Sequence, residues 1–174
     1  MPKSRTTRKK VTAYLGLGSN LGDRRQNLRR ACEMLTDVAT VNRLSPLYDT
    51  APVGNTDQPR FLNAVCRVAT DLSPEDLLRF IKDMEQKMGR RPGPPNSPRP
   101  IDIDILFYND VVMHTPDLTI PHPRLAERAF VLAPLADIAP DLVHPVTGKT
   151  VARILVELER RDGDAVKTPR GAGD

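Results

Sequence analysis

Two aspartates separated by a single residue are the most chemically informative feature of the sequence. Asp102 and Asp104 lie in the segment Ile-Asp-Ile-Asp-Ile-Leu-Phe, residues 101–107. In a strand, residues i and i+2 point the same way, so both carboxylates project from one face with Cα atoms about 7 Å apart, and the isoleucines fill the other face. Magnesium, which binds through one or two carboxylates plus water and phosphate oxygens, is a natural partner. For this motif alone, an exposed strand with ordinary polar alternation is the competing interpretation.

Cationic groups flank the aspartate pair in sequence. Residues 89–100, Gly-Arg-Arg-Pro-Gly-Pro-Pro-Asn-Ser-Pro-Arg-Pro, form a loop with five prolines that carries Arg90, Arg91 and Arg99. A loop of this length in a compact domain is usually functional or disordered, and guanidinium groups fork onto phosphate oxygens. Downstream, His122 lies between two prolines, where it could donate a hydrogen bond to a phosphate or a leaving group. A solvated charged loop and an unremarkable histidine are the alternatives.

Two classes of nucleotide-binding motif are excluded by the sequence. Gly16 and Gly18 follow an apolar run, but a dinucleotide fingerprint needs a third glycine where Leu21 stands, and Gly22 is one position late. The chain also lacks the phosphate-loop pattern G-x-x-x-x-G-K-[ST]. We interpret these glycines as positions where a flat ligand approaches the end of a strand.

The elements that must position these groups alternate along the chain. Apolar and β-branched runs predict strands at 11–18, 41–50 (interrupted near Pro46), 61–70 and 101–107. Asp23 opens one predicted helix, and Ser73 caps another that runs from Pro74 to Gly89. The order strand, helix, strand, strand, helix, strand is typical of an α+β, ferredoxin-like βαββαβ antiparallel sheet with helices on one face. A short strand at 111–113 and helices at 128–138 and 151–160 are C-terminal additions.

Composition predicts one ordinary globular domain. The chain has 174 residues and a net charge of +4, but five basic residues fall within positions 1–10, which leaves the remainder near −1. We therefore expect a basic N-terminal tail at 1–10, a single domain at 11–160 and a C-terminal tail at 161–174. Two scattered cysteines favour a cytoplasmic protein with reduced thiols, and the absence of any run of about 18 apolar residues indicates no membrane span. A nucleic-acid-binding arm is the alternative interpretation of the basic tail. We expect a monomer that binds neither nucleic acid nor membranes.

Several separated motifs resemble one family. The segments are LGLGSNLGDR (15–24), YDTAPVG (48–54), QPRFLNAV (58–65), EQKMGRR (85–91), PRPIDIDILFYND (98–110) and IPHPRLAERAFVLAPLADIAPDLVHP (120–145). In this order they resemble the 6-hydroxymethyl-7,8-dihydropterin pyrophosphokinases of folate biosynthesis. The resemblance covers about residues 11–158 and implies a ferredoxin-like enzyme. Such an enzyme transfers pyrophosphate from ATP to the hydroxymethyl group of the reduced pterin and releases AMP.

The resemblance also implies roles for individual residues. Asp102 and Asp104 would bind two magnesium ions brought with ATP, and together with Arg90 and Arg99 they would be catalytic. Besides Asp102, the pterin would contact Gly18, Thr50, Ala51, Pro52, Val53, Phe61, Asn63 and Phe130, with the two phenylalanines sandwiching the ring. ATP would contact Glu85, Arg90, Arg99, Ile105, Thr119, His122 and Arg128.

The proline-rich loop departs from the family pattern. Pro92 replaces the second arginine of an Arg-x-Arg run, Pro95 and Asn96 stand where the family has Arg-Trp, and the loop is about one residue shorter. In the family this loop closes over bound substrates, and a stiffer loop puts that closure in question. Two alternatives therefore stay open: a pyrophosphokinase relative that binds without turnover, and a ferredoxin-like regulatory or RNA-binding module with aromatics exposed on its sheet.

Overall fold

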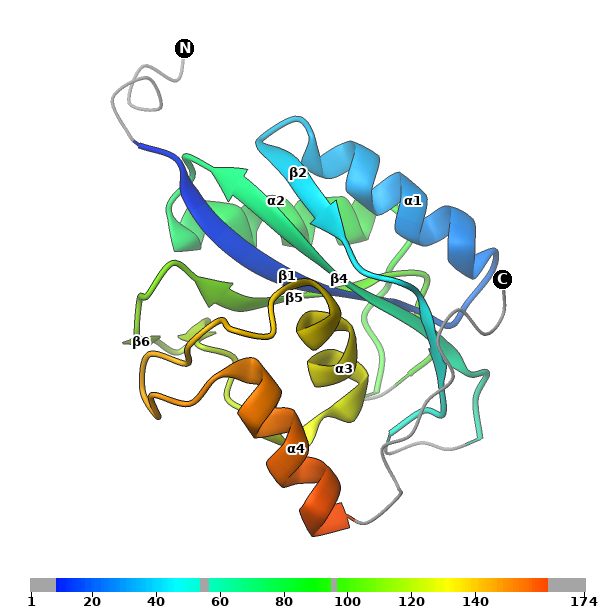
Figure 1. Ribbon diagram of the computed structural model, residues 1–174. Coiled ribbons are helices and arrows are strands. Elements are labelled where there is room, and N and C mark those ends of the chain that lie inside the picture. The colour runs from blue at the N-terminus through cyan, green and yellow to red at the C-terminus, as the bar shows by residue number, and fades with distance from the viewer. Residues whose placement is uncertain (1–8, 54–56, 95–96, 163–174) are drawn as a thin grey trace.

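A five-stranded antiparallel sheet forms the centre of the molecule (Figure 1). The computed structural model describes residues 9–53, 57–94 and 97–162. Along the sheet the order is β2–β4–β1–β5, and β3 pairs with β4 beyond the end of β2. The strands are β1 (Val11–Ser19), β2 (Ala39–Leu44), β3 (Tyr48–Thr50), β4 (Phe61–Thr70) and β5 (Asp102–Tyr108). This is the strand order of a ferredoxin-like βαββαβ unit, as the sequence predicts.

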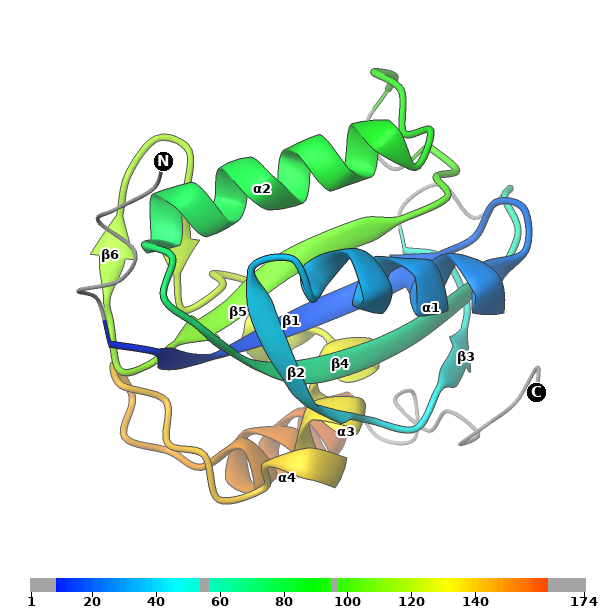
Figure 2. The ribbon, with the colours of Figure 1, turned by 90° about the horizontal axis from the view of Figure 1, so that it is seen from above.

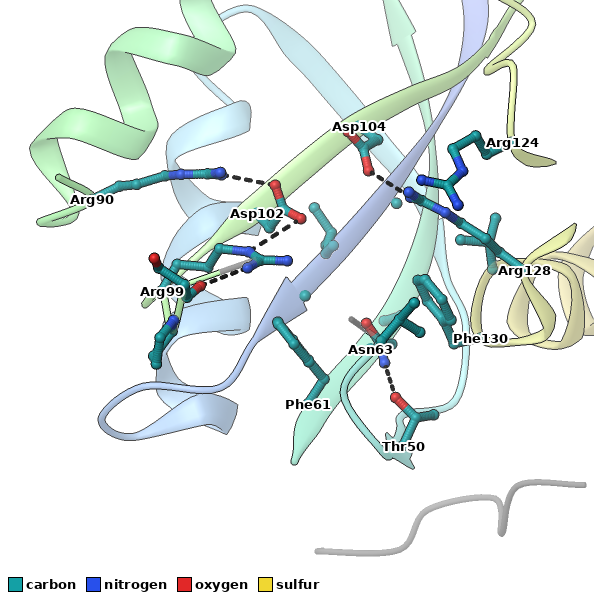
Figure 3. A pocket seen from close by; sticks show the side chains of 18 of the residues that line it. Thr50, Phe61, Asn63, Arg90, Arg99, Asp102, Asp104, Arg124, Arg128 and Phe130 are labelled. Carbon is teal, nitrogen blue, oxygen red and sulfur yellow. Dashed lines mark hydrogen bonds and ion pairs between the residues drawn. The ribbon is translucent and has the colours of Figure 1, made fainter. Parts of the chain in front are cut away.

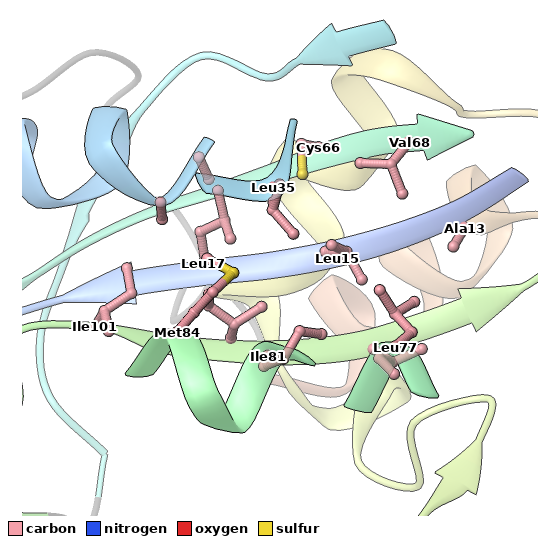
Figure 4. Close-up of a cluster of buried hydrophobic side chains, with 14 of the residues drawn as sticks. Ala13, Leu15, Leu17, Leu35, Cys66, Val68, Leu77, Ile81, Met84 and Ile101 are labelled. Atoms are coloured by element: carbon pink, nitrogen blue, oxygen red, sulfur yellow. The ribbon is translucent and has the colours of Figure 1, made fainter. Parts of the chain in front are cut away.

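Two helices cover one face of the sheet, as Figure 2 shows. Helix α1 (Arg24–Leu35) begins after Asp23, whose carboxylate accepts a hydrogen bond from the Gln26 amide. Helix α2 (Pro74–Lys87) begins after Ser73, whose hydroxyl accepts one from the Asp76 amide. Each cap satisfies a backbone donor that the first helical turn leaves unpaired. The apolar stripes of both helices pack on alternate residues of the central strands (Figure 4).

Two further helices cover part of the opposite face. Helices α3 (Ala129–Ile138) and α4 (Val151–Asp162) pack on each other and enclose a second core around Phe107 (Figure 2). A single-turn 3-10 helix (Leu125–Glu127) precedes α3, and the short hairpin β6 (Met113–His114) and β7 (Thr119–Ile120) precedes that turn. The sheet is therefore layered on both faces, and its aromatic side chains Tyr14 and Phe107 are buried.

Strand β5 shows why the fold can hold a polar site. Ile101, Ile103 and Ile105 are buried in the core beneath α2, so the intervening aspartates must face the other way. On that other face Leu106 belongs to the core under α3 and α4. The two helices do not reach the beginning of β5, which leaves this end of the face open for Asp102 and Asp104.

Most predicted elements are confirmed, with shifts at their ends. The run predicted at 41–50 is two strands, β2 and β3, separated around Pro46. Strand β7 was not predicted, because a two-residue strand carries no periodicity to recognise. Most of the predicted tails, residues 1–8 and 163–174, lies outside the described residues, as do Pro95 and Asn96. None of the helices in the described ranges is both long and apolar enough to span a membrane.

Candidate active site

A pocket of about 560 Å³ opens where β1, β4 and β5 are left uncovered by α3 and α4 (Figure 3). Its walls come from the strands and from three connecting segments, which are residues 50–53, residues 90–94 and 97–99 of the proline-rich loop, and the stretch from His122 into α3. The predicted site residues that line it are Gly18, Thr50, Ala51, Val53, Phe61, Asn63, Arg90, Arg99, Asp102, Asp104, His122, Arg128 and Phe130. Residues from distant parts of the sequence thus meet in one place, and both aspartates point into it, as the strand alternation predicts.

The two aspartates have different surroundings. Asp102 accepts a hydrogen bond from Arg90 Nη1 at 2.7 Å, and Arg99 Nε lies 3.5 Å from its other oxygen. Asp104 has looser neighbours, with Arg128 Nη1 at 3.8 Å and His122 Nε2 at 3.9 Å. Partial burial, followed by the charge of Asp102, raises the pKa of Asp104 to about 6. Two arginines therefore balance the negative charge of Asp102, whereas the nearest cationic group to Asp104 lies 3.8 Å away.

A buried acid lies beneath this end of the pocket. Glu85 on α2 is only 3% exposed and accepts hydrogen bonds from the Ile103 amide at 2.9 Å and from Arg90 Nη1 at 3.1 Å. Burial raises the pKa of Glu85, against the lowering effects of these two partners. Arg90 Nη1 also donates to the Ile101 carbonyl. Glu85 therefore fixes β5 and Arg90 from below, and the structure gives it no place on the pocket surface.

The opposite end of the pocket is aromatic and amidic. Asn63 is 7% exposed, and its Nδ2 donates to Thr50 Oγ1 at 2.6 Å, which fixes the orientation of the amide between Phe61 and Phe130 (Figure 3). Gly18 lies beside it, and a Cβ atom at that position would stand 2.9 Å from Asn63 Oδ1. Only glycine leaves this amide undisturbed.

Two arginines connect the aromatic end to the carboxylates. The Arg99 guanidinium lies 4.8 Å from the ring centroid of Phe61 and next to Asp102. The Arg128 guanidinium lies 5.5 Å from the ring centroid of Phe130 and next to Asp104. Cation–π contacts of this kind hold planar guanidinium groups against rings. Each arginine therefore spans from one ring to one carboxylate.

His122 presents a hydrogen-bond donor to the charged end. Its Nδ1 accepts the backbone N–H of Arg124 at 3.1 Å, so the neutral ring carries its proton on Nε2, which faces Asp104. Burial and then the charge of Arg128 lower the pKa of His122 to about 4. At neutral pH the ring is uncharged and can donate one hydrogen bond into the pocket.

Comparison with known proteins identifies the family. The family model described as 7,8-dihydro-6-hydroxymethylpterin-pyrophosphokinase (HPPK) matches residues 14–140. The chain belongs to the HPPK family. The 2-amino-4-hydroxy-6-hydroxymethyldihydropteridine pyrophosphokinase of Bacillus subtilis is 43% identical over 137 residues, covering 78% of this chain and 82% of that protein.

Other HPPK relatives are much longer. The mitochondrial folate synthesis bifunctional protein of Arabidopsis thaliana is 50% identical over 139 residues, which cover 79% of this chain but 24% of that protein. The chain spans less than a quarter of the length of the first such relatives. The crystal structure of wild-type Plasmodium falciparum HPPK-DHPS with pterin and p-hydroxybenzoate has the same fold, with a TM-score of 0.72 and 20% identity over 90% of this chain and 43% of that one.

Four predicted HPPK site residues lie outside the pocket lining: Pro52, Glu85, Ile105 and Thr119. Ile105 is buried in the core under α2, and Thr119 lies on β7. Their roles in binding pterin or ATP stay predictions. Arg124 does line the pocket but was not among the predicted site residues, although it stands only two positions after His122. An RNA-binding module is disfavoured, because the sheet aromatics that it would expose are buried.

Proposed function

We propose that this protein is a magnesium-dependent pyrophosphokinase whose substrates are ATP and 6-hydroxymethyl-7,8-dihydropterin. The hydroxymethyl oxygen forms a bond to the β-phosphorus of ATP, the bond from that phosphorus to the oxygen bridging the α-phosphate breaks, and AMP leaves while the hydroxyl gives up its proton. The observation that carries the proposal is the pocket itself, in which an aromatic and amidic end adjoins a charged end with a carboxylate pair.

The aromatic end suits a pterin. A flat, polar ring system is bound well by stacking on aromatic side chains together with hydrogen bonds along its edge. Phe61 and Phe130 supply the stacking surfaces, and the amide of Asn63, held by Thr50, supplies a fixed edge partner. The hydroxymethyl group of a ring bound there would extend toward the carboxylates.

The charged end suits a metal-bound triphosphate. Asp102 and Asp104 would hold two magnesium ions, because carboxylates are the protein ligands that magnesium takes alongside phosphate and water oxygens. Within residues 9–53, 57–94 and 97–162, no group of three or more His, Cys, Asp or Glu side chains is arranged to hold a metal ion by itself. A pair of carboxylates suits an ion that takes its other ligands from substrate phosphates and water. When bound, magnesium neutralises phosphate charge and polarises the phosphoryl group.

The protein's own donors complete the charge balance. Arg90 and Arg99 on the loop side and Arg128 on the α3 side can bind phosphate oxygens, and His122 can donate its Nε2 proton. In phosphoryl transfer the enzyme contributes mainly positioning and electrostatic stabilisation. The arginines that touch both an aromatic ring and an aspartate are placed to align the two substrates.

A product analysis tests the proposal. The protein is incubated with ATP, magnesium and the reduced hydroxymethylpterin, and the nucleotide and pterin products are identified by chromatography and mass spectrometry. We expect AMP and the pterin diphosphate in equal amounts, formed only when all three components are present. Release of ADP would indicate an ordinary kinase, and no consumption of ATP would indicate a protein that binds without turnover. Either result contradicts the proposal.

A further inference from the structure

One buried amide joins three segments next to the pocket, which are the turn after β1, residues 58–59 and the end of the proline-rich loop at Arg99. Asn20 lies in the turn after β1, is 1% exposed and is not part of the pocket wall described above. Its Nδ2 donates to Gln58 Oε1 at 2.8 Å and to the Pro59 carbonyl at 3.1 Å. Its Oδ1 accepts the Arg99 amide at 2.9 Å, and its own amide donates to the Arg99 carbonyl at 3.1 Å. A single side chain thus ties the turn to two separate segments.

These two segments carry residues from opposite ends of the pocket. Pro59 lies two positions before Phe61, which begins β4 at the aromatic end. Arg99 contributes its side chain to the charged end, where it lies beside Asp102, and also stacks on the ring of Phe61. The Asn20 amide is therefore placed where it sets the position of the Arg99 backbone relative to the start of β4.

We infer that Asn20 is a positioning residue for the transfer reaction, an inference that rests on the proposed function. By fixing the Arg99 backbone, it keeps the Arg99 guanidinium in position between Phe61 and Asp102, and it does so without contacting either substrate. The Arg99 side chain is long, and Arg99 lies between α2 and β5, outside any helix or strand. Its backbone therefore needs a fixed anchor if the guanidinium is to meet phosphate oxygens in one geometry. A misplacement of about 1 Å at such a group can slow catalysis about 100-fold.

The test compares Asn20→Ala with Asn27→Ala. Asn27 serves the same turn, because its Nδ2 donates to Ser19 Oγ and to the Leu21 carbonyl, but no contact of its side chain with residues 58–59 or Arg99 is found. Initial rates of AMP formation give kcat and both KM values for each variant. We expect kcat to fall about 100-fold for Asn20→Ala, with each KM changing less than about fivefold. For Asn27→Ala we expect kcat within about threefold of the unmodified protein.

A conservative variant separates positioning from loss of stability. Asn20→Asp keeps an acceptor for the Arg99 amide but loses the donor to residues 58–59, so we expect its kcat to exceed that of Asn20→Ala about tenfold. Amide hydrogen exchange, followed by NMR, should accelerate at Arg99 in Asn20→Ala and not in Asn27→Ala. Thermal unfolding of each variant reports any general loss of folding. If Asn20→Ala does not fold, Gln58→Ala removes one of the same bonds at a less buried position and should lower kcat about threefold to tenfold.

The outcomes distinguish this inference from the proposed function. Failure of the unmodified protein to form AMP refutes the function, whereas the exchange at Arg99 can still be measured. If the unmodified protein turns over, the inference is overturned by any one of three results. These are a kcat for Asn20→Ala within threefold of normal, an equal loss in Asn27→Ala, and a kcat for Asn20→Asp no higher than that for Asn20→Ala.

Discussion

The two ends of the pocket are built in different ways. At the aromatic end, Phe61 and Asn63 on strand β4 are buried, and Phe130 at the start of α3 is half-buried. The Asn63 amide is fixed by its hydrogen bond to Thr50. At the charged end the aspartates are partly open, with side chains 29% exposed for Asp102 and 36% for Asp104. Their arginine partners come mainly from loops and helix boundaries. The aromatic end is preformed, whereas the charged end consists of ion pairs that are open to solvent.

This difference matches what the proposed reaction requires of each end. A pterin ring is rigid and would find its surfaces already in place, so little ordering would be needed for it to bind. A triphosphate with metal ions would bring a large negative charge and would replace the existing ion pairs of Arg90 and Arg99 with Asp102. Groups that are partly hydrated can make that exchange without first breaking a dry salt bridge. Arg99 and Arg128 connect the two ends, because each touches one ring and one carboxylate.

The largest expected effect is at the carboxylates. Asp102→Asn or Asp104→Asn should lower AMP formation by about 1,000-fold or more, because metal-based charge stabilisation is worth several kcal/mol. The fold should persist in both, since neither side chain is part of a hydrophobic core. Asp110→Asn is the matched control, an exposed aspartate just beyond the end of β5. Rates near normal in both site variants would contradict the metal assignment.

A smaller effect is expected when the aromatic end is disturbed. Gly18→Ala places a Cβ atom 2.9 Å from Asn63 Oδ1, so the amide must shift from its bond with Thr50. We expect KM for the pterin to rise about tenfold, the size of effect given by losing about one good hydrogen bond, while KM for ATP stays within about twofold. Steady-state kinetics with each substrate varied in turn provide the measurement.

A double-mutant cycle tests whether Gly18 acts through the amide. Asn63→Ala alone should raise KM for the pterin by a similar factor, and adding Gly18→Ala to it should have little further effect, because residues in contact are not additive. Fully additive losses would mean that Gly18 contacts the ligand by some other route. An equal rise in KM for ATP would remove the distinction between the two ends.

Regular elements and the aspartate pair could be predicted from sequence because their signals are local. Strand alternation alone places Asp102 and Asp104 on one face, and serine and aspartate caps mark where both early helices begin. Bringing Phe130 and Arg128 to the same pocket required the family resemblance, since no local pattern links α3 to β4. The fold class was equally accessible, because it follows from the order of elements.

Contacts between loops could not be predicted in the same way. Glu85 falls on the buried stripe of α2, four positions after Ile81, but nothing near it in sequence shows that its partner is the amide of Ile103. The sequence indicates only that Asn20 is a turn residue, and its hydrogen bond with the Arg99 amide is found only in the structure. Such contacts depend on how the sheet stacks distant segments, and hydrophobic periodicity carries no information about them.

The smallest expected effect is on stability, and it reveals the charge imbalance directly. Since the pKa of Asp104 is raised from 3.8 to about 6, the folded state holds this proton more tightly than the unfolded chain does. The ionised carboxylate therefore destabilises the fold increasingly as pH rises from about 4 to 6, and by a constant amount above that. Without metal, Asp104→Asn should match the unmodified protein near pH 4 and melt a few degrees higher above pH 6, as judged by thermal unfolding in EDTA.

Asn63→Ala, a change at the preformed end, is the control, and its difference in Tm from the unmodified protein should not vary over this pH range. If the difference in Tm between Asp104→Asn and the unmodified protein is also independent of pH, the negative charge of Asp104 is already balanced without a metal ion.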